Sequence, residues 1–474
     1  MTLMIHNTLS GKKEEFVPLE EGKIRMYVCG PTVYDYSHIG HARTYIAFDI
    51  IRRYLEFKGY KITFVSNITD IDDKIINRAN ELGISPAMLA QKYMRAFFRE
   101  MDALKVKEPD VQPLATGHIP EIIELIKRLE ENGYAYQVDG DVYYDVDKFK
   151  DYGKLSHQNI DELKAGARVA PNEKKRNPLD FALWKASKPG EPKWNSPWGY
   201  GRPGWHIECT AMIMKHLGEQ IDIHGGGQDL IFPHHENEIA QAEGATHKKF
   251  VKYWMHTGFL NIRGEKMSKS LGNIIPIKKA LELWEPEVLR LFFALTHYRR
   301  QIDFSEEGVD NAKKSLERLY NTLSIIDESK KNIREDKNEE DKRFIEFIAQ
   351  SEKDFLSNMD DDFNTPGALA IVFTVAREVN KYLKDRSPNR EALEKIEKFF
   401  NNVKEIFGIL EETGMKEKQQ GGLTVNSLLD LIVNIRTILR KNKQYQLADM
   451  IRDELSKLGV ELRDSKEGTT YVIK

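Results

Sequence analysis

A strand, a helix and a second strand follow one another within the first 70 residues, and this unit most constrains the fold of the chain. Residues 23–29 (KIRMYVC) have a strand composition, residues 40–58 carry apolar side chains at helical spacing, and residues 61–68 (KITFVSNI) return to a strand pattern. The two strands of such a unit are parallel, and open parallel sheets bind ligands at the carboxyl ends of their strands. We therefore expect a Rossmann-type α/β domain with a ligand site that follows Cys29.

The remaining sequence divides into further segments. Strand patterns at QIDIHGGG (220–227) and VKYWMHTGFLNI (251–262) extend the α/β domain over residues 1–273, with an insertion over about 110–203. Helical periodicity dominates afterwards, and two charged stretches that begin at Glu328 and Glu411 are typical of linkers. We expect a helical region over 274–327, an α-helical bundle over 328–410 and a small mixed α/β module over 423–474.

Composition excludes several classes of protein. The chain has 474 residues, of which 41% are apolar and 31% charged, as in multidomain globular proteins. No run approaches the roughly 18 apolar residues of a membrane span, and the first residues lack a secretion signal, so we expect a cytoplasmic protein without membrane contact. The formal net charge of −3 neither predicts nor excludes a nucleic-acid partner.

Two stretches have the character of nucleotide-binding segments. In YVCGPTVYDYSHIGHAR (27–43), His38 and His41 flank a helix start, where free N–H groups and a nearby glycine suit phosphates. In EKMSKSLGN (265–273), Lys266 and Lys269 lie among small residues, a pattern that favours a loop closing positive charge over a polyphosphate. Either stretch alone is also compatible with an ordinary solvated loop.

A third stretch, IFPHHENEIAQAEG (231–244), indicates metal ligands. We expect a helix that starts near Pro233 and stops at Gly244. On a helix, His234 lies at i, i+4 from Glu238, and His235 also reaches Glu238 at i, i+3. One histidine and one glutamate supply only two of the four ligands of a zinc site, so others must come from elsewhere.

The chain has two cysteines, Cys29 and Cys209, and both lie next to segments already singled out. A disulfide between them is improbable in a reducing compartment. The alternative to a ligand role is that both are small buried residues of the core. Seven of the 13 histidines fall between His206 and His256, which indicates a polar lining, although a solvated helix face is the alternative.

The two nucleotide motifs together resemble the signature of class I aminoacyl-tRNA synthetases. More specifically, MYVCGPTVYDYSHIGHAR, NITDIDDKI, GWHIECTAM and HGGGQDLIFPHHENEIAQ are similar, in this order, to the cysteinyl-tRNA synthetase family. The similarity continues to LADMIRDELSKLGVELRDSKEGTTY and so covers essentially the whole chain.

The resemblance implies that the chain activates L-cysteine with ATP and Mg²⁺ and transfers it to tRNA(Cys). It implies catalytic roles for His38, His41, Lys266 and Lys269, ATP contacts also from Gly40 and Asp229, a substrate pocket with Thr69 and Trp205, and one Zn²⁺ held by Cys29, Cys209, His234 and Glu238. Asp229 is alternatively a helix cap and Trp205 a core residue. We expect His235 and Glu236 beside the site or on the surface. Residues 274–327 would contact the tRNA stem, residues 423–474 the anticodon, and the enzyme would be a monomer.

Zinc gives a physical reason for selectivity. Cysteine and serine differ by one atom, and a pocket without a metal rejects such an analogue only modestly. Coordination favours a thiolate over a hydroxyl, since a thiol loses its proton far more readily. Two rival functions are a related ligase that joins cysteine to an amino sugar and a catalytically silent RNA-binding paralogue. The continuation past Leu423 argues against the first, and the complete set of motif residues argues against the second.

Overall fold

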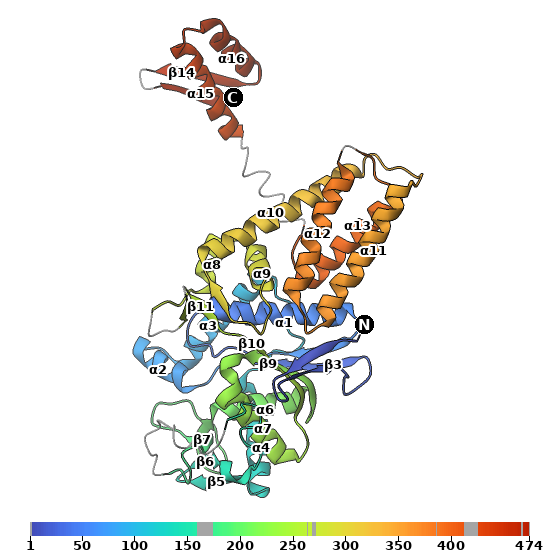
Figure 1. The fold of residues 1–474 in the computed structure, drawn as a ribbon. Helices are drawn as coiled ribbons and strands as arrows, with labels where there is room; N and C mark the ends of the chain where they lie inside the picture. Colours follow the sequence, from blue (N-terminus) through green and yellow to red (C-terminus); the bar gives the residue numbers. More distant parts are fainter. Residues whose placement is uncertain are drawn as a thin grey trace. The chain divides into compact units, whose positions relative to one another are not determined.

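The computed structural model describes residues 2–158, 174–262, 264–267, 272–384, 386–411, 425–465 and 468–473. It divides into two compact units, Met1–Ile409 and Leu410–Lys474 (Figure 1). Among the described residues, no helix combines the length and the apolar character needed to cross a membrane. The finer boundaries expected within the first unit remain predictions.

A four-stranded parallel sheet forms the centre of the first unit. Its order is β10 (Val251–Thr257), β9 (Ile221–Gly227), β3 (Lys23–Val28) and β4 (Lys61–Val65). Helix α1 (Ile39–Phe57) connects β3 to β4, and these two strands pair in parallel from Lys23↔Lys61 onwards. The expected strand–helix–strand unit and the Rossmann-type fold are therefore confirmed.

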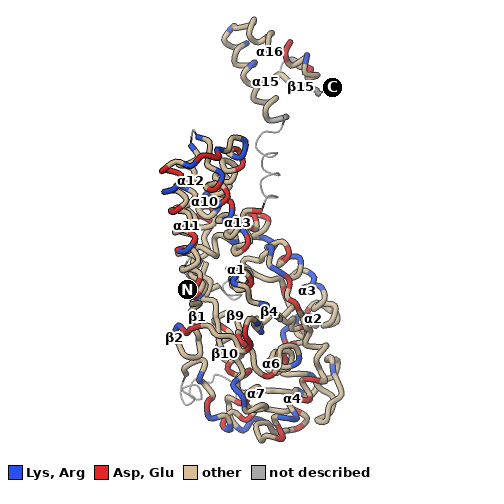
Figure 2. The backbone as a smooth tube through the Cα atoms, turned by 90° about the vertical axis from the view of Figure 1, so that its right-hand side faces the viewer, with Lys and Arg blue, Asp and Glu red and all other residues tan. Residues whose placement is uncertain are grey.

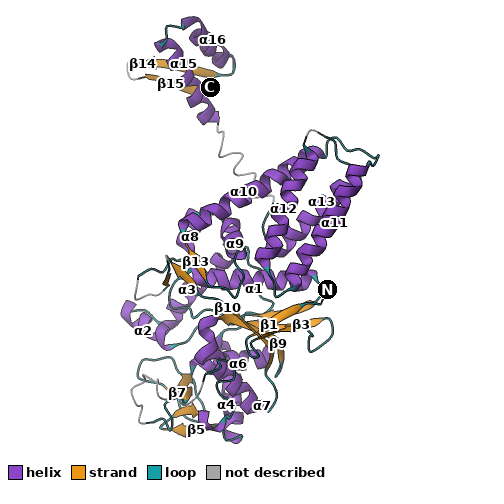
Figure 3. Cartoon of the chain, viewed as in Figure 1, coloured by secondary structure: helices purple, strands orange, loops and turns teal. Residues whose placement is uncertain are grey.

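Helices cover both faces of this sheet (Figures 1 and 3). Helix α1 lies on one face, with Ile46 and Ile50 buried at 2% exposure or less. Helices α6 (Trp205–His216) and α7 (Glu236–Thr246) lie on the other, where Ile207 and Ile239 join a core with Tyr27 of β3. Because β3 ends between these layers, residues that follow it reach both α1 and the α6–α7 pair.

The segment between β4 and α6 forms the outer part of the unit. It contains α2 (Asp73–Leu82), α3 (Pro86–Ala103), α4 (Ile119–Glu131), and an antiparallel sheet of β5 (Ala135–Val138), β6 (Asp141–Tyr144), β7 (Phe181–Ala186) and β8 (Gly201–Pro203). A hairpin of β1 (Met4–Asn7) and β2 (Lys12–Glu15) precedes the central sheet.

After β10 the chain forms a small sheet and then helices. Strand β11 (Leu260–Ile262) pairs with β12 (Glu265–Lys266) and β13 (Ile302–Phe304), with α8 (Ile277–Leu283) and α9 (Pro286–Ala294) in the connection. Four long helices follow: α10 (Glu306–Ser329), α11 (Glu339–Asp360), α12 (Thr365–Leu383) and α13 (Arg390–Phe407). Acidic and basic residues are interspersed along them (Figure 2).

The second unit is a small mixed α/β module. It comprises α15 (Val425–Lys441), α16 (Tyr445–Lys457) and a hairpin of β14 (Val460–Ser465) and β15 (Gly468–Ile473). Its core contains Leu429, Leu455, Val460 and Leu462. The mixed α/β character expected for this end of the chain is therefore confirmed.

The PHHENE helix starts near the expected residue but ends later than expected. Residues Ile231–His235 form a π-helical turn that runs directly into α7, and only Phe232 has non-helical backbone, so the helical conformation is continuous from Pro233. Gly244 does not stop the helix, which continues to Thr246. A Cβ at Gly244 would lie 2.9 Å from the Tyr144 hydroxyl oxygen, so this glycine allows close packing against β6.

Candidate functional site

A cavity of about 490 Å³ lies at the carboxyl ends of the central strands. The residues that line it come from the segments that follow β3, β9 and β10, from the start of α6 and from the β11–β12 region. This is the position at which open parallel sheets bind their ligands. One end of the cavity holds cysteine and histidine side chains, and the other holds the start of α1.

Cys29, Cys209, His234 and Glu238 lie together at the first end. Their ligand atoms are all within 4.8 Å of one another, and each residue is at most 7% exposed. The two Sγ atoms are 4.0 Å apart, and Nε2 of His234 is 2.9 Å from Oε1 of Glu238. Two thiols, an imidazole and a carboxylate within this distance match the donor types and number of a zinc site.

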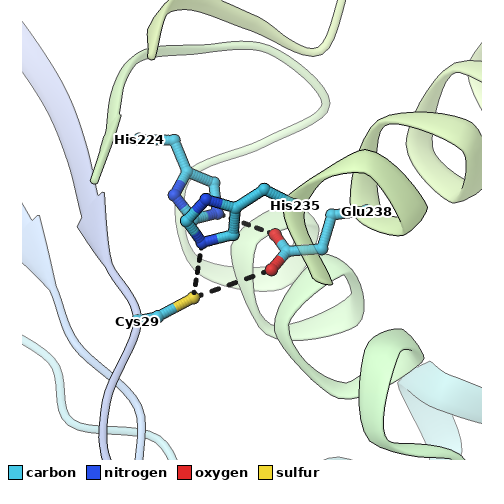
Figure 4. A group of neighbouring side chains, drawn as sticks. All are labelled: Cys29, His224, His235 and Glu238. Atoms are coloured by element: carbon cyan, nitrogen blue, oxygen red, sulfur yellow. Dashed lines mark hydrogen bonds and ion pairs between the residues drawn. The ribbon is translucent and has the colours of Figure 1, made fainter. Parts of the chain in front are cut away.

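A second, overlapping group consists of Cys29, His224, His235 and Glu238 (Figure 4). His224 Nε2 is 2.7 Å from Oε2 of Glu238, and His235 Nε2 is 3.3 Å from the Cys29 sulfur. Cys29, Cys209 and His234 line the cavity, whereas His224 and His235 do not. A substrate in the cavity can therefore reach the first group, whereas His224 and His235 contact that group on the side away from the cavity.

The supporting histidines continue away from the cavity. His235 Nδ1 is 2.8 Å from His256 Nε2, and His256 Nδ1 is 2.8 Å from the Thr8 hydroxyl oxygen. His206 Nδ1 is 2.9 Å from Nδ1 of His234, which leaves Nε2 of His234 toward Glu238. Partners of this kind fix the ring orientation and tautomer of metal-binding histidines.

These contacts shift the acidity of the cluster. Burial alone would raise the pKa of Glu238, but His224 and His234 lower it to about 2. Burial raises the pKa of Cys29 well above its usual range, while the hydrogen bond from Cys29 lowers the pKa of Cys209. A cation bound here would therefore take the place of a proton on Cys29.

The two residues expected in the substrate pocket lie beside the cluster. Trp205 lines the cavity and stacks on His234, with ring centroids 4.5 Å apart, so it is a wall of the site rather than a core residue. Thr69 also lines the cavity, is 3% exposed and accepts a hydrogen bond from Asn67 Nδ2.

The start of α1 forms the other end of the cavity. His38 is the residue that precedes α1, and its ring stacks on that of His41 with centroids 3.8 Å apart. A Cβ at Gly40 would lie 2.8 Å from Cε of Met267, so the absence of a side chain lets the segment after β12 approach the helix. Asp229 is exposed and lines the cavity; α7 is preceded directly by His235, so Asp229 is not its cap.

Part of the lysine motif lies outside the described residues. Lys266 belongs to β12, which pairs with β11 through Asn261↔Lys266. Lys269 is not among the residues that the structure describes. The roles expected for both lysines remain predictions.

Sequence reasoning missed several buried residues around the metal cluster. His235 and Glu236 are both fully buried, so the surface position, one of their two expected alternatives, is wrong. Glu236 accepts hydrogen bonds from the backbone N–H groups of Leu155 and Ser156, which ties α7 to the inserted segment. The concentration of histidines between residues 206 and 256 is the available signal for the supporting residues.

Comparisons with known proteins place these observations in a family. Residues 15–314 match the family described as tRNA synthetases class I (C) catalytic domain, and residues 354–411 match the DALR domain. The chain is 55% identical over 474 residues to the "Cysteine--tRNA ligase" of Thermococcus gammatolerans, with 99% of each chain covered. It is 49% identical over 489 residues to the protein of the same name from Aquifex aeolicus, with 99% of each covered.

Solved structures of other synthetases share the fold. Methionyl-tRNA synthetase from Mycobacterium tuberculosis, in complex with methionyl-adenylate, is 17% identical with a TM-score of 0.60, over 81% of this chain and 89% of that one. The LeuRS of Agrobacterium radiobacter, in a ternary complex, is 11% identical with a TM-score of 0.63, over 83% and 85%. At these identities the likeness concerns the fold alone.

Proposed function

The chain belongs to the cysteine–tRNA ligases of the class I tRNA synthetase family, and on this premise we propose that it selects cysteine with a zinc ion held by Cys29, Cys209, His234 and Glu238. The observation that carries the proposal is that these donor atoms lie within 4.8 Å of one another while three of the residues line the cavity. The cluster therefore offers four ligands on its protein side and access for a fifth ligand from the substrate.

The bound zinc ion would supply a Lewis acid that favours a substrate thiolate over a serine hydroxyl. The protein side chains set the geometry of this contact. Glu238 presents Oε1 to His234 and Oε2 to His224, so a hydrogen bond holds its carboxylate in one orientation. Trp205, stacked on His234, limits the space for the substrate side chain, and Thr69 bounds the same pocket.

At the other end of the cavity, ATP and Mg²⁺ would bind over the start of α1. His38 and His41 lie at the start of this helix, where the positive end of the helix dipole favours a phosphate, and Gly40 lines the same cavity without a side chain. Lys266 and Lys269 would stabilise the charge on the departing pyrophosphate, and Asp229 would contact the ribose. Attack by the cysteine carboxylate on the α-phosphorus forms cysteinyl-adenylate and releases pyrophosphate.

Transfer of the cysteinyl group to the 3′ end of tRNA(Cys) would complete the reaction. We assign contact with the tRNA stem to residues 274–327, which include α8, α9 and most of α10. The second unit has its own core, as expected of a separate module, and we assign it to the anticodon.

Two measurements test the metal-based selectivity. Pyrophosphate exchange into ATP should depend on cysteine and be nearly absent with serine, and purified active enzyme should contain about one zinc per chain. Substantial serine-dependent exchange would reject the selectivity mechanism. Full cysteine-dependent exchange by enzyme free of zinc would reject the site itself.

A further inference from the structure

We infer that Arg43 is a positioning residue for cysteine activation: it holds the strand ribbon that carries Lys266 in register with helix α1, which begins directly after His38 and carries His41. The ribbon consists of strands β11, β12 and β13, and Lys266 lies in β12. Arg43 lies in α1, is 3% exposed and lines the same cavity. The inference rests on the proposed roles of the three motif residues.

The guanidinium of Arg43 binds two separate segments through their carbonyl groups. Nη1 donates to the carbonyl oxygens of Gly258, at 2.8 Å, and Phe259, at 2.6 Å. Nη2 donates to those of Tyr298, at 3.4 Å, and Arg300. The first pair lies between β10 and β11, and the second lies in the turn before β13. A planar fork with several donors can bind four carbonyls, whereas the compact ammonium of lysine cannot match that geometry.

The two segments bound by Arg43 also set the position of the ribbon. The Gly258 N–H donates to the Tyr298 carbonyl at 2.8 Å, and Ile302 N–H donates to the Phe259 carbonyl at 3.1 Å. A Cβ at Gly258 would lie 2.6 Å from the carbonyl oxygens of Arg299 and Arg300, so the segments meet more closely than a side chain allows. Because β11 then pairs with both β13 and β12, a displacement at this contact moves the backbone of Lys266.

The Asp362 carboxylate binds two side chains of the turn before β13. Its Oδ1 accepts from the Tyr298 hydroxyl at 2.7 Å, and its Oδ2 accepts from Arg299 Nε at 2.7 Å. Asp362 is fully buried between α11 and α12, and it and Phe363 have φ values of 57° and 52°. Left-handed backbone is costly at residues other than glycine, so two in succession indicate that the surrounding contacts impose this turn.

The arrangement predicts a specific kinetic effect. Cysteine is proposed to bind at the metal cluster, whereas Lys266 is proposed to act on the departing pyrophosphate in the transition state. Loosening the ribbon should therefore lower kcat for activation and leave cysteine binding unchanged, because a small misplacement of a catalytic group reduces the rate strongly.

The test compares Arg43→Lys with Arg52→Lys in zinc-loaded, full-length enzyme. Arg52 is a matched control on the same helix: it is 7% exposed, and its guanidinium donates to the Glu108 carbonyl and pairs with Glu56, away from the ribbon. In cysteine-dependent pyrophosphate exchange, Arg43→Lys should lower kcat about ten-fold or more, with KM for cysteine within about two-fold of wild type. Arg52→Lys should keep the kcat and the KM for cysteine of the wild type, even if its Tm falls as much as that of Arg43→Lys.

Wild-type kcat in folded Arg43→Lys, or an equal loss of kcat in the two variants, would overturn the inference. If Arg43→Lys does not fold, Asp362→Asn is the alternative variant, since it retains the shape of the side chain but weakens the ion pair with Arg299. We expect a roughly three-fold loss of kcat with an unchanged KM for cysteine. No loss of kcat would overturn the inference. Lys266→Ala distinguishes a failure of the role proposed for Lys266 from a failure of the positioning role of Arg43. Full exchange by that variant rejects the proposed role of Lys266, whereas an inactive Lys266→Ala beside a fully active Arg43→Lys rejects only the positioning role.

Discussion

At the metal end of the cavity the reactive side chains are buried and contact one another, whereas at the nucleotide end they are partly exposed and depend on backbone contacts. Cys209 and Glu238 are 2% and 0% exposed, and each touches another member of the cluster. Asp229 is exposed, and the ribbon with Lys266 is held through main-chain carbonyls. Substitutions should therefore abolish metal binding at the metal end and displace catalytic groups at the nucleotide end.

The largest effect is expected from Cys209→Ser. Loss of one thiolate should remove stoichiometric zinc and lower cysteine-dependent exchange roughly 1,000-fold, because it deletes both a ligand and the group that recognises the substrate. Metal analysis and exchange kinetics measure the two losses. Thr210→Ser, next along α6 and equally buried, should keep its zinc and activity. A Cys209→Ser enzyme with a full complement of zinc would contradict the ligand assignment.

Lys266→Ala should have a smaller and more selective effect. We expect kcat for exchange to fall about 100-fold, because the lysine acts on charge that develops in the transition state. Zinc content and KM for cysteine should remain those of wild type, since the metal cluster is untouched. Lys248→Ala, which removes a surface lysine paired with Glu219, is the control. Loss of zinc on changing Lys266 would show that the two ends are not independent.

Removal of residues 423–474 should spare both ends of the cavity. The first unit contains every described residue of the two ends, so exchange should stay within about two-fold of wild type. Charging of tRNA(Cys) should fall about ten-fold in kcat/KM, because the contacts of the module with the anticodon are lost. Unchanged charging would argue against the assignment of this module.

The smallest effect concerns the stability that depends on a buried glutamate of α3. Burial raises the pKa of Glu100 in α3 to about 7, from a usual value of 4.5. Between these values the native state binds more protons than the unfolded chain, so stability should decrease as pH rises from about 4.5 to 7. Glu100→Gln should therefore be more stable than wild type at pH 8 by about 2 kcal/mol, and little different at pH 4.

Denaturant unfolding at the two pH values measures this difference. Glu282→Gln, which changes an exposed glutamate on α8, should give no such dependence. A stability difference of the same size at both pH values would point to packing rather than to the charge of Glu100.

Local patterns predicted much of the fold and half of the metal cluster. The strand and helix periodicities around α1 depend only on neighbouring residues, and the spacing of His234 and Glu238 is a property of one helical turn. The positions of His224 and His256 depend instead on how β9 and β10 pair, with Trp254↔His224 and His256↔Gly226 in register. The role of Gly244 could not be predicted either, because its neighbour Tyr144 lies 100 residues away in the sequence.

The contacts of Arg43 were beyond sequence reasoning for another reason. Its acceptors are main-chain carbonyls, which every residue possesses, so no residue type marks them. The metal end is more readable because cysteine, histidine and glutamate are chemically distinctive. The metal end thus depends on side chains that the sequence identifies, whereas the nucleotide end depends on main-chain contacts that it does not.

The presence of only two cysteines, both in the metal cluster, makes the chain a reporter of its own occupancy. A thiol reagent has no other target in the sequence, so alkylation measured by intact mass gives zero, one or two adducts without background. Protection of both sulfurs by bound metal, followed by their exposure to a chelator, would count filled sites molecule by molecule.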